Sequence, residues 1–377
     1  MTPTALGHNL LVTPAAPAVH GAPRRWPYVV AALLLAVAAT AAVAVAGRTS
    51  PNKIAGTAGL SDLGPAPALK GGGDWINSAP LTTADLHGKV VLYDFWTYSC
   101  VNCVRTLPYL RSWAARYERN GLVVVGIHSP EFQFEHDLHN VRRAVSELHV
   151  SYPVVLDNQL AIWSAFKNNY WPADYLADRN GRIRANHIGE GDYANTENLI
   201  RRLLGLTKAS PRSSSPQLPR AGSSPTEADR LTPETYLGTE RGATNADPGT
   251  RTYPEPTAEL FNGDARVAGS WTATPQYLRS GASGASITLR YRAREVNLVM
   301  ATDDGKPLEV DVLVDGQPLA PAYRTSQTAV DAEGHTSVRV AASDLYRIVL
   351  GPAIEVHTLR LVARAPGLRA FAFTFGA

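Results

Sequence analysis

The feature that most constrains the fold is the segment around the chain's only two cysteines, Cys100 and Cys103. The apolar run KVVLYDF, residues 89–95, precedes them, and such a run is typical of a buried parallel or central strand. Apolar residues then recur at spacings of three and four from Val104 to Tyr117, which predicts a helix. The cysteines therefore lie where a buried strand gives way to a helix, a junction typical of α/β folds.

The same alternation continues to residue 207. Buried-strand patterns recur at LVVVGI and YPVVL, each followed by a helical pattern. Asn180 and Gly181 then mark a hairpin, and a last helical segment, TENLIRRLLG, follows. We predict an α/β sandwich for residues 74–207.

The C-terminal part has a different pattern. Residues 208–229 are rich in Ser and Pro and predict an extended linker. From residue 230 to 377, short segments with period-2 alternation are separated by turn signals such as Asp315-Gly316. We therefore expect an all-β antiparallel sandwich over 230–377.

The N-terminal part contains 22 uncharged residues, Trp26–Gly47, flanked by arginines. A run of about 20 apolar residues is long enough to cross a bilayer as a helix. We expect residues 26–47 to be a single transmembrane anchor or a cleaved signal, 1–25 a cytoplasmic tail and 48–73 a linker. On this prediction the remainder of the chain lies outside the cytoplasmic membrane.

The composition argues against several classes of partner. The net charge is only +3, from 36 basic and 33 acidic residues, so no nucleic-acid partner is expected. Two cysteines cannot complete a four-ligand zinc site, so we expect no metal. Val104 follows the second cysteine, which excludes the haem-attachment pattern. We expect His128, His136 and His139 to be solvated or loop histidines.

The position of Cys100 at the start of a helix favours redox chemistry. The positive end of the helix dipole favours the thiolate, which is the attacking species. Cys100 could then attack a substrate disulfide, and Cys103, one turn later, could resolve the mixed disulfide. A structural disulfide, half of a shared metal site and a peroxide-reducing cysteine remain alternatives. The last has Thr97 three residues before Cys100 but Tyr93 where such enzymes carry a proline.

The segment DFWTYSCVNC resembles the active site of the thioredoxin superfamily. Asp94 stands where thioredoxins have a buried aspartate, and Pro108 where they kink the helix. The segments YPVVLD and LADRNGRI are similar to the membrane-anchored TlpA-like branch. Further segments, from GKVVLYDFWTYSCVNC to the final AFAFTFG, resemble the extracytoplasmic part of the DipZ-type cytochrome c biogenesis proteins, over about residues 64–377. Thr106 departs from the TlpA-like pattern, which often has an acid there.

The resemblance implies a thioredoxin-like domain followed by a β-domain likened to carbohydrate-binding modules. It implies a thiol–disulfide oxidoreductase that reduces protein disulfides, with the Cys100–Cys103 pair in place of a cofactor. DipZ-type proteins also carry a multi-helix electron carrier of the CcdA type, whereas this chain has one hydrophobic segment. A separate CcdA-like membrane donor is therefore expected. A thiol oxidase or isomerase, and an envelope protein that binds a glycan or a partner, remain alternatives.

The resemblance also suggests roles for neighbouring residues. Asp94 would be a buried carboxylate with a raised pKa that takes the proton of Cys103. A cis bond between Trp171 and Pro172 would leave the Trp171 backbone free to pair with an extended substrate chain.

Several aromatic residues have two interpretations. Trp96 and Tyr98 either bind substrate, as a shield or rim around the cysteines, or belong to the core. Glu131 either lines the site or has no role there. Five aromatic residues of the β-domain would bind a glycan if exposed, or else are core: Trp271, Tyr277, Tyr291, Tyr323 and Tyr346.

Overall fold

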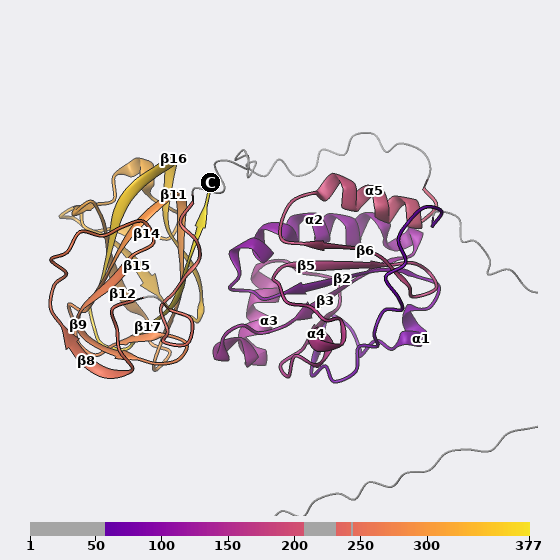
Figure 1. Cartoon of the computed structure of the whole chain (residues 1–377), viewed down its shortest axis with the longest axis horizontal. Helices are drawn as coiled ribbons and strands as arrows, with labels where there is room; N and C mark the ends of the chain where they lie inside the picture. Colours follow the sequence, from indigo (N-terminus) through magenta and orange to yellow (C-terminus); the bar gives the residue numbers. More distant parts are fainter. Residues whose placement is uncertain (1–56, 207–230, 243) are drawn as a thin grey trace, which may run out of the picture. The chain divides into compact units, whose positions relative to one another are not determined.

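The computed structural model describes residues 57–206, 231–242 and 244–377 (Figure 1). The expected anchor at 26–47 and linker at 208–229 lie outside these residues. None of the helices within them is long and apolar enough to cross a membrane.

The N-terminal part of the described chain is built on a six-stranded sheet with the order β1-β4-β3-β2-β5-β6. The central strands β2, β3 and β4 run parallel, and the outer pairings are antiparallel. The strands are β1 (Trp75–Ile76), β2 (Val90–Trp96), β3 (Leu122–His128), β4 (Val154–Leu156), β5 (Ala173–Ala177) and β6 (Ile183–Ile188). This arrangement confirms the predicted α/β class.

Helices cover both faces of this sheet. They are α1 (Thr83–Leu86), α2 (Val101–Tyr117), α3 (Leu138–Glu147), α4 (Ala161–Ala165) and α5 (Tyr193–Leu203), with 3₁₀ turns η1 (Glu118–Asn120) and η2 (Gln133–His136). Figure 1 shows α2 and α5 along the same face of the sheet. Because side chains alternate along a strand, Leu92 and Trp96 of β2 enter the core beneath α2, α3 and α5, whereas Val91 and Phe95 enter the core with α1 and α4.

The end of the expected 48–73 linker instead packs on this domain. The Leu63 amide donates to the carbonyl of Ile183 at 2.9 Å, and the Ala66 amide donates to Gly181 at 2.8 Å. Residues 63–66 therefore run along β6 and the turn before it, whereas the Gly73 amide donates to the Leu156 carbonyl of β4 at 2.7 Å. Residues 57–73 thus belong to the domain, because their backbone polar groups find partners on it.

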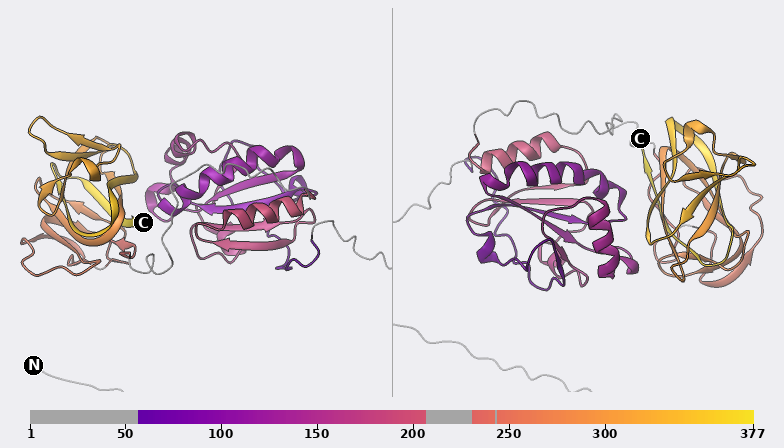
Figure 2. Two further views of the ribbon diagram at one scale, coloured as in Figure 1. Left: turned by 90° about the horizontal axis from the view of Figure 1, so that it is seen from above. Right: turned by 180° about the vertical axis from the view of Figure 1, so that it is seen from behind.

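The C-terminal part is an antiparallel β-sheet domain, as predicted. Its strands are β7 (Thr235–Tyr236), β8 (Gly249–Tyr253), β9 (Ala265–Ala273), β10 (Leu278–Ser280), β11 (Ser286–Thr302), β12 (Leu308–Val314), β13 (Gln317–Pro318), β14 (Thr328–Val330), β15 (Thr336–Val340), β16 (Asp344–Ala363) and β17 (Leu368–Gly376), with a 3₁₀ turn η3 (Pro321–Tyr323). They form one 11-stranded hydrogen-bonded sheet rather than two separate ones. The long strands β11 and β16 pair along their length, and β9 pairs with β11 as well as β10, so the sheet curls around its own core (Figure 2).

Candidate active site

Cys100 and Cys103 lie at the start of α2, where the sequence predicted them. Cys100 is the N-cap, and its Sγ accepts a hydrogen bond from the Cys103 backbone amide at 3.3 Å. Cys100 is half-buried, whereas Cys103 is 0% exposed, and both are free thiols. Burial raises the pKa of Cys103 well above its usual value, and Cys100 and Asp94 add to the shift. The pair thus consists of one reachable sulfur and one held as a buried thiol.

Asp94 lies on the face of β2 that also carries Leu92 and Trp96, in the core beneath α2. Its side chain is fully buried, and neither carboxylate oxygen has a hydrogen-bond partner in the described structure. Burial, and the charge of Asp174 next to it, raise its pKa well above the ordinary value. The environment is that expected for a proton acceptor of Cys103, and its role in catalysis stays a prediction.

The Trp171–Pro172 peptide bond is cis, as expected. Pro172 directly precedes β5, whose first residue, Ala173, pairs with Phe95 near the end of β2. The Trp171 indole donates to the Ser129 carbonyl at 3.0 Å, and its ring packs against the same core as Cys100. The Trp171–Pro172 turn therefore lies beside the C-terminal end of β2, where the loop to Cys100 begins.

The loop before Cys100 is fixed by a buried acid that the sequence did not single out. Ser99 Oγ donates to Glu135 Oε1 at 2.5 Å, and the amides of Glu131 and Phe132 donate to Glu135 Oε2 at 2.6 and 2.9 Å. Glu135 is fully buried, and burial raises its pKa to about 7. Ser99, the residue next to the half-buried Cys100, is thus held by a carboxyl group that titrates near neutral pH.

His128, expected to be solvated, is fully buried at the end of β3. Its ring lies 5.7 Å from that of Tyr98 in a stacked arrangement, and Thr97 Oγ1 is 3.3 Å from its Nε2. Burial lowers its pKa to about 3, so the imidazole is neutral at physiological pH.

Trp96 and Tyr98 do not form a substrate-binding rim, which corrects that prediction. Their side chains are 0% and 1% exposed, so both belong to the core. Trp96 lies edge-on to the His128 ring. Tyr98 points its hydroxyl at the Ser343 carbonyl, to which it donates at 3.3 Å.

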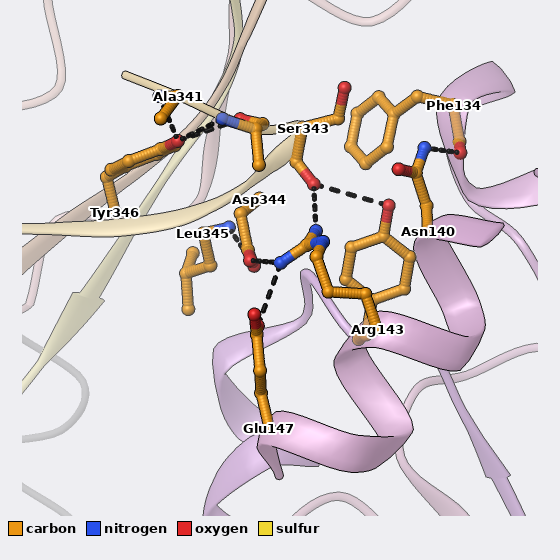
Figure 3. A network of polar contacts seen from close by, with 11 residues as sticks. Phe134, Asn140, Arg143, Glu147, Ala341, Ser343, Asp344, Leu345 and Tyr346 are labelled. Carbon is orange, nitrogen blue, oxygen red and sulfur yellow. Dashed lines mark hydrogen bonds and ion pairs between the residues drawn. The ribbon is translucent and has the colours of Figure 1, made fainter. Parts of the chain in front are cut away.

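The hydrogen bond of Tyr98 to the Ser343 carbonyl belongs to a polar network with α3. Figure 3 shows Arg143, Glu147, Ser343 and Asp344 of this network. Arg143 of α3 donates to Asp344 Oδ2 at 2.8 Å and to the Ser343 carbonyl at 3.1 Å, and it also pairs with Glu147. Its guanidinium carbon lies 6.0 Å from the centre of the Tyr98 ring. The segment that leads to Cys100 is therefore held in place by contacts with Ser343, directly through Tyr98, and with Asp344 through Arg143.

Glu131 has a structural partner in the β-domain. Its Oε1 accepts hydrogen bonds from the Tyr236 hydroxyl at 2.7 Å and from Arg241 at 2.8 Å. The side chain therefore binds the C-terminal domain, although its backbone amide supports Glu135.

The candidate glycan-binding aromatics are mostly core. Trp271, Tyr291 and Tyr346 are 0%, 1% and 6% exposed, which corrects the idea that they stack on sugar rings. Only Tyr277 and Tyr323 of the five are half-buried. Among the described residues, one group has the geometry to hold a metal ion: the exposed side chains Asp331, Glu333 and His335.

Two family models match the chain. The Redoxin family covers residues 74–200, and the model described as "Thioredoxin like C-terminal domain" covers 232–376. These two matches coincide with the α/β part and the β-sheet part of the structure.

Similar proteins include Protein DipZ of Mycobacterium bovis and of Mycobacterium tuberculosis, each 36% identical over 331 residues. The match covers 85% of this chain but 44% of either relative, so the chain spans less than half the length of these relatives. Thiol-disulfide oxidoreductase YkuV of Bacillus subtilis is 28% identical over 38% of this chain and 97% of its own. A solved "Thioredoxin-like Protein in the Oxidized Form" is 30% identical, with a TM-score of 0.35, and covers 38% of this chain and 97% of its own.

Proposed function

We propose that this chain, whose residues 74–200 belong to the thioredoxin-like Redoxin family, is a thiol–disulfide oxidoreductase that reduces protein disulfides through Cys100 and Cys103. The observation that carries the proposal is the asymmetry of the pair. Cys100 is reachable at the N-terminus of α2, and Cys103 is sealed one turn behind it. A pair that only stabilised the fold would not need one cysteine within reach of solvent.

The reaction starts at the sulfur of Cys100. As thiolate it attacks one sulfur of the substrate disulfide, so a mixed disulfide forms and one substrate thiolate leaves. Cys103 loses its proton and attacks the Cys100 sulfur. The second substrate thiolate then leaves, and the Cys100–Cys103 disulfide remains. The substrate gains two electrons, which the protein's dithiol supplies.

Asp94 accepts the proton of Cys103 in this second step. Its carboxylate is buried on the α2 side of the sheet and has no competing hydrogen-bond partner among the residues that the structure describes. Its raised pKa makes it a stronger base than an ordinary aspartate, as a thiol with a raised pKa requires.

The Trp171–Pro172 turn receives the substrate chain. Trp171 is half-buried and packs against the same core as Cys100, so an extended peptide paired with its backbone would run past the reachable sulfur.

The proposal includes a cellular setting. Residues 26–47 anchor the chain in the cytoplasmic membrane, with the cysteines on the outer side. A separate CcdA-like membrane dithiol protein reduces the Cys100–Cys103 disulfide again, and oxidised exported proteins such as apocytochrome c are the clients. A glycan partner would have to be bound by Tyr277 and Tyr323, because the other candidate aromatics are core.

A disulfide-reduction assay on the full chain tests the proposal, with a small dithiol as electron donor. Wild-type protein should turn over a protein disulfide, and Cys100→Ser should not. Turnover retained in Cys100→Ser would exclude Cys100 as the nucleophile.

The reduction potential of the pair sets the direction of the reaction. A value near about −270 mV agrees with a reductant, and one near about −120 mV would identify an oxidant.

A further inference from the structure

We propose that Asp174 is the second carboxyl group of a proton route that leads from Cys103 through Asp94 to a small pocket between β5, β6 and α5. The inference deepens the proposed function and rests on it. Asp174 acts through Asp94, so it is a positioning residue and not a catalytic one.

The first observation is a row of three ionisable residues across neighbouring strands. Asp94 of β2 lies directly opposite Asp174 of β5, and Asp174 lies directly opposite His187 of β6. Residues opposite each other in antiparallel strands project from the same face, with Cβ atoms about 5 Å apart. The row therefore leads from the core beneath α2 to an edge strand of the sheet.

The second observation is that polar atoms of all three side chains in this row lack hydrogen-bond partners in the described structure. Both oxygens of Asp94, Oδ1 of Asp174 and Nε2 of His187 are buried and have no hydrogen-bond partner within the described structure. Buried polar atoms are paired in the great majority of cases, so three unsatisfied neighbours in a row are unusual. Proton exchange among Asp94, Asp174 and His187, or with water, would explain why these buried polar atoms have no fixed partner.

The third observation is a pocket at the outer end of the row. It has a volume of about 40 Å³, and its lining includes Asp174, His187, Asn186, Asp192, Asn195 and Thr196. A polar cavity of more than about 15 Å³ can hold a water molecule. Asp94 is fully buried, whereas Asp174 is only half-buried, so Asp174 lies between the interior and this pocket.

The electrostatic surroundings agree with a shared proton. Burial raises the pKa of Asp174 to about 7 and, together with the charge of Asp174, that of Asp94 well above its usual value. The other titratable side chains around the pair include Cys103 from α2, Tyr152 before β4, Tyr193 from α5 and His187 from β6. Asp192, at the start of α5, lines the same pocket as Asp174. The pKa values of both tyrosines are raised mainly by burial, so both are neutral at physiological pH and neither offers a positive charge.

The proton therefore has a continuous course. When Cys103 attacks the Cys100 sulfur, its proton passes to the Asp94 carboxylate, then to Asp174, and leaves through the pocket to solvent. No oxidant or reductant beyond the substrate disulfide and the protein's own dithiol is needed. The second substrate thiolate takes its proton from solvent.

Asp174→Asn tests this route in the full chain, because the change keeps the size of the side chain and removes the carboxylate. Pre-reduced protein is mixed with a disulfide substrate, and the two thiol-release steps are followed as a function of pH. Without the negative neighbour, the pKa of Asp94 falls, so the acid limb of the second step should move down by about one pH unit. The plateau rate should also fall about tenfold, since Asp94 becomes a weaker base with no acceptor behind it.

Two controls make the result specific. The first step should be unchanged in Asp174→Asn, and Asp304→Asn, the same change at an exposed side chain outside the row and the pocket, should behave as wild type in both steps. Wild-type turnover with an unaltered second step in Asp174→Asn would overturn the route and leave the proposed function intact. Failure of the wild-type protein to release thiol would instead contradict the proposed function.

A measurement on the wild-type protein guards against a variant that does not fold. Carboxyl ¹³C NMR should show Asp94 and Asp174 titrating as a coupled pair, with two apparent pKa values that belong to both residues. Independent titration of both residues at the usual aspartate pKa would overturn the proposal.

Discussion

At the scale of single residues, the difference between the two sulfurs decides which of them reacts. Cys100 is half-buried, and Cys103 is 0% exposed with a raised pKa. Brief treatment of the reduced native protein with iodoacetamide should therefore modify Cys100 at least about 100-fold faster than Cys103, because only thiolates within reach of solvent react. Peptide mass spectrometry measures the two rates. In urea the two rates should become similar, and equal rates in the native protein would contradict this assignment.

The raised pKa of Glu135 predicts that the free energy of unfolding depends on pH. Its pKa is raised to about 7, so the folded state binds more protons than the unfolded chain between about pH 4.5 and 7, and stability is lost as pH rises through this range. Glu135→Gln keeps an acceptor for the amides of Glu131 and Phe132 and offers a donor to Ser99 Oγ. The variant should gain about 3 kcal/mol relative to wild type between about pH 5 and pH 8.

Urea unfolding at the two pH values measures this difference, and all other titrating groups are common to both proteins. A difference between the variant and wild type that does not change with pH would show that Glu135 does not titrate in this range.

Sequence patterns singled out the cysteines, Asp94 and Pro172 as candidate site residues, but not Asp174 and Glu135. Asp174 lies two residues after Pro172, and its importance depends on which residue of β2 it pairs with. Strand register depends on pairing between segments far apart in the sequence, and local periodicity does not show which residues lie opposite each other. Glu135 stands in an acidic, polar stretch that predicts an exposed side chain. It is buried because the tight turn η2 directs it inward, where neighbouring residues pack over it.

At the scale of elements, the N-terminus of α2 gives Cys100 a structural role beside its chemical one. Its Sγ caps the helix by accepting from the Cys103 amide. Serine is a good N-cap and alanine a poor one, so Cys100→Ala should be about 1 kcal/mol less stable than Cys100→Ser. Urea unfolding of the two variants checks this. Equal stability would show that residue 100 does not cap the helix.

The regular elements could largely be predicted, because β2, β3 and α2 carry strong apolar patterns. The least predictable part was residues 57–73, whose Gly and Pro content indicated a linker. Their contacts include backbone hydrogen bonds to β6 and β4 and ion pairs of Asp62 with Arg182 and Arg184. Leu60, Ala66 and Leu69 also pack against the core. These contacts join segments far apart in the sequence, so composition does not reveal them.

At the scale of the whole molecule, Arg143 connects α3 with residues 343–344 and packs over Tyr98. Arg143→Ala removes the hydrogen bonds to Asp344 and the Ser343 carbonyl and the one to Glu147, and it leaves Asp344 without its strongest partner. We expect a loss of about 1–2 kcal/mol in urea unfolding, since the pair is only partly exposed. Arg142→Ala is the matched control, because Arg142 is the next residue in the helix and its own side chain is exposed. An equal effect of both changes would mean that the network in Figure 3 contributes nothing specific.

The two-domain arrangement was predicted from the change in pattern near residue 230, but the contacts between Tyr98, Arg143 and Ser343 were not. They join residues about 200 positions apart through a backbone carbonyl, which has no sequence signature.

The central claim is that Cys100 forms the covalent bond to substrate and Cys103 releases it. Trapping with Cys103→Ser in the full chain tests it most directly, since the variant lacks the sulfur that resolves the mixed disulfide. With a disulfide substrate, we predict one adduct per protein at Cys100, located by mass spectrometry, and release of one substrate thiol. Absence of the adduct in Cys103→Ser, or the same adduct in Cys100→Ser, would contradict the account.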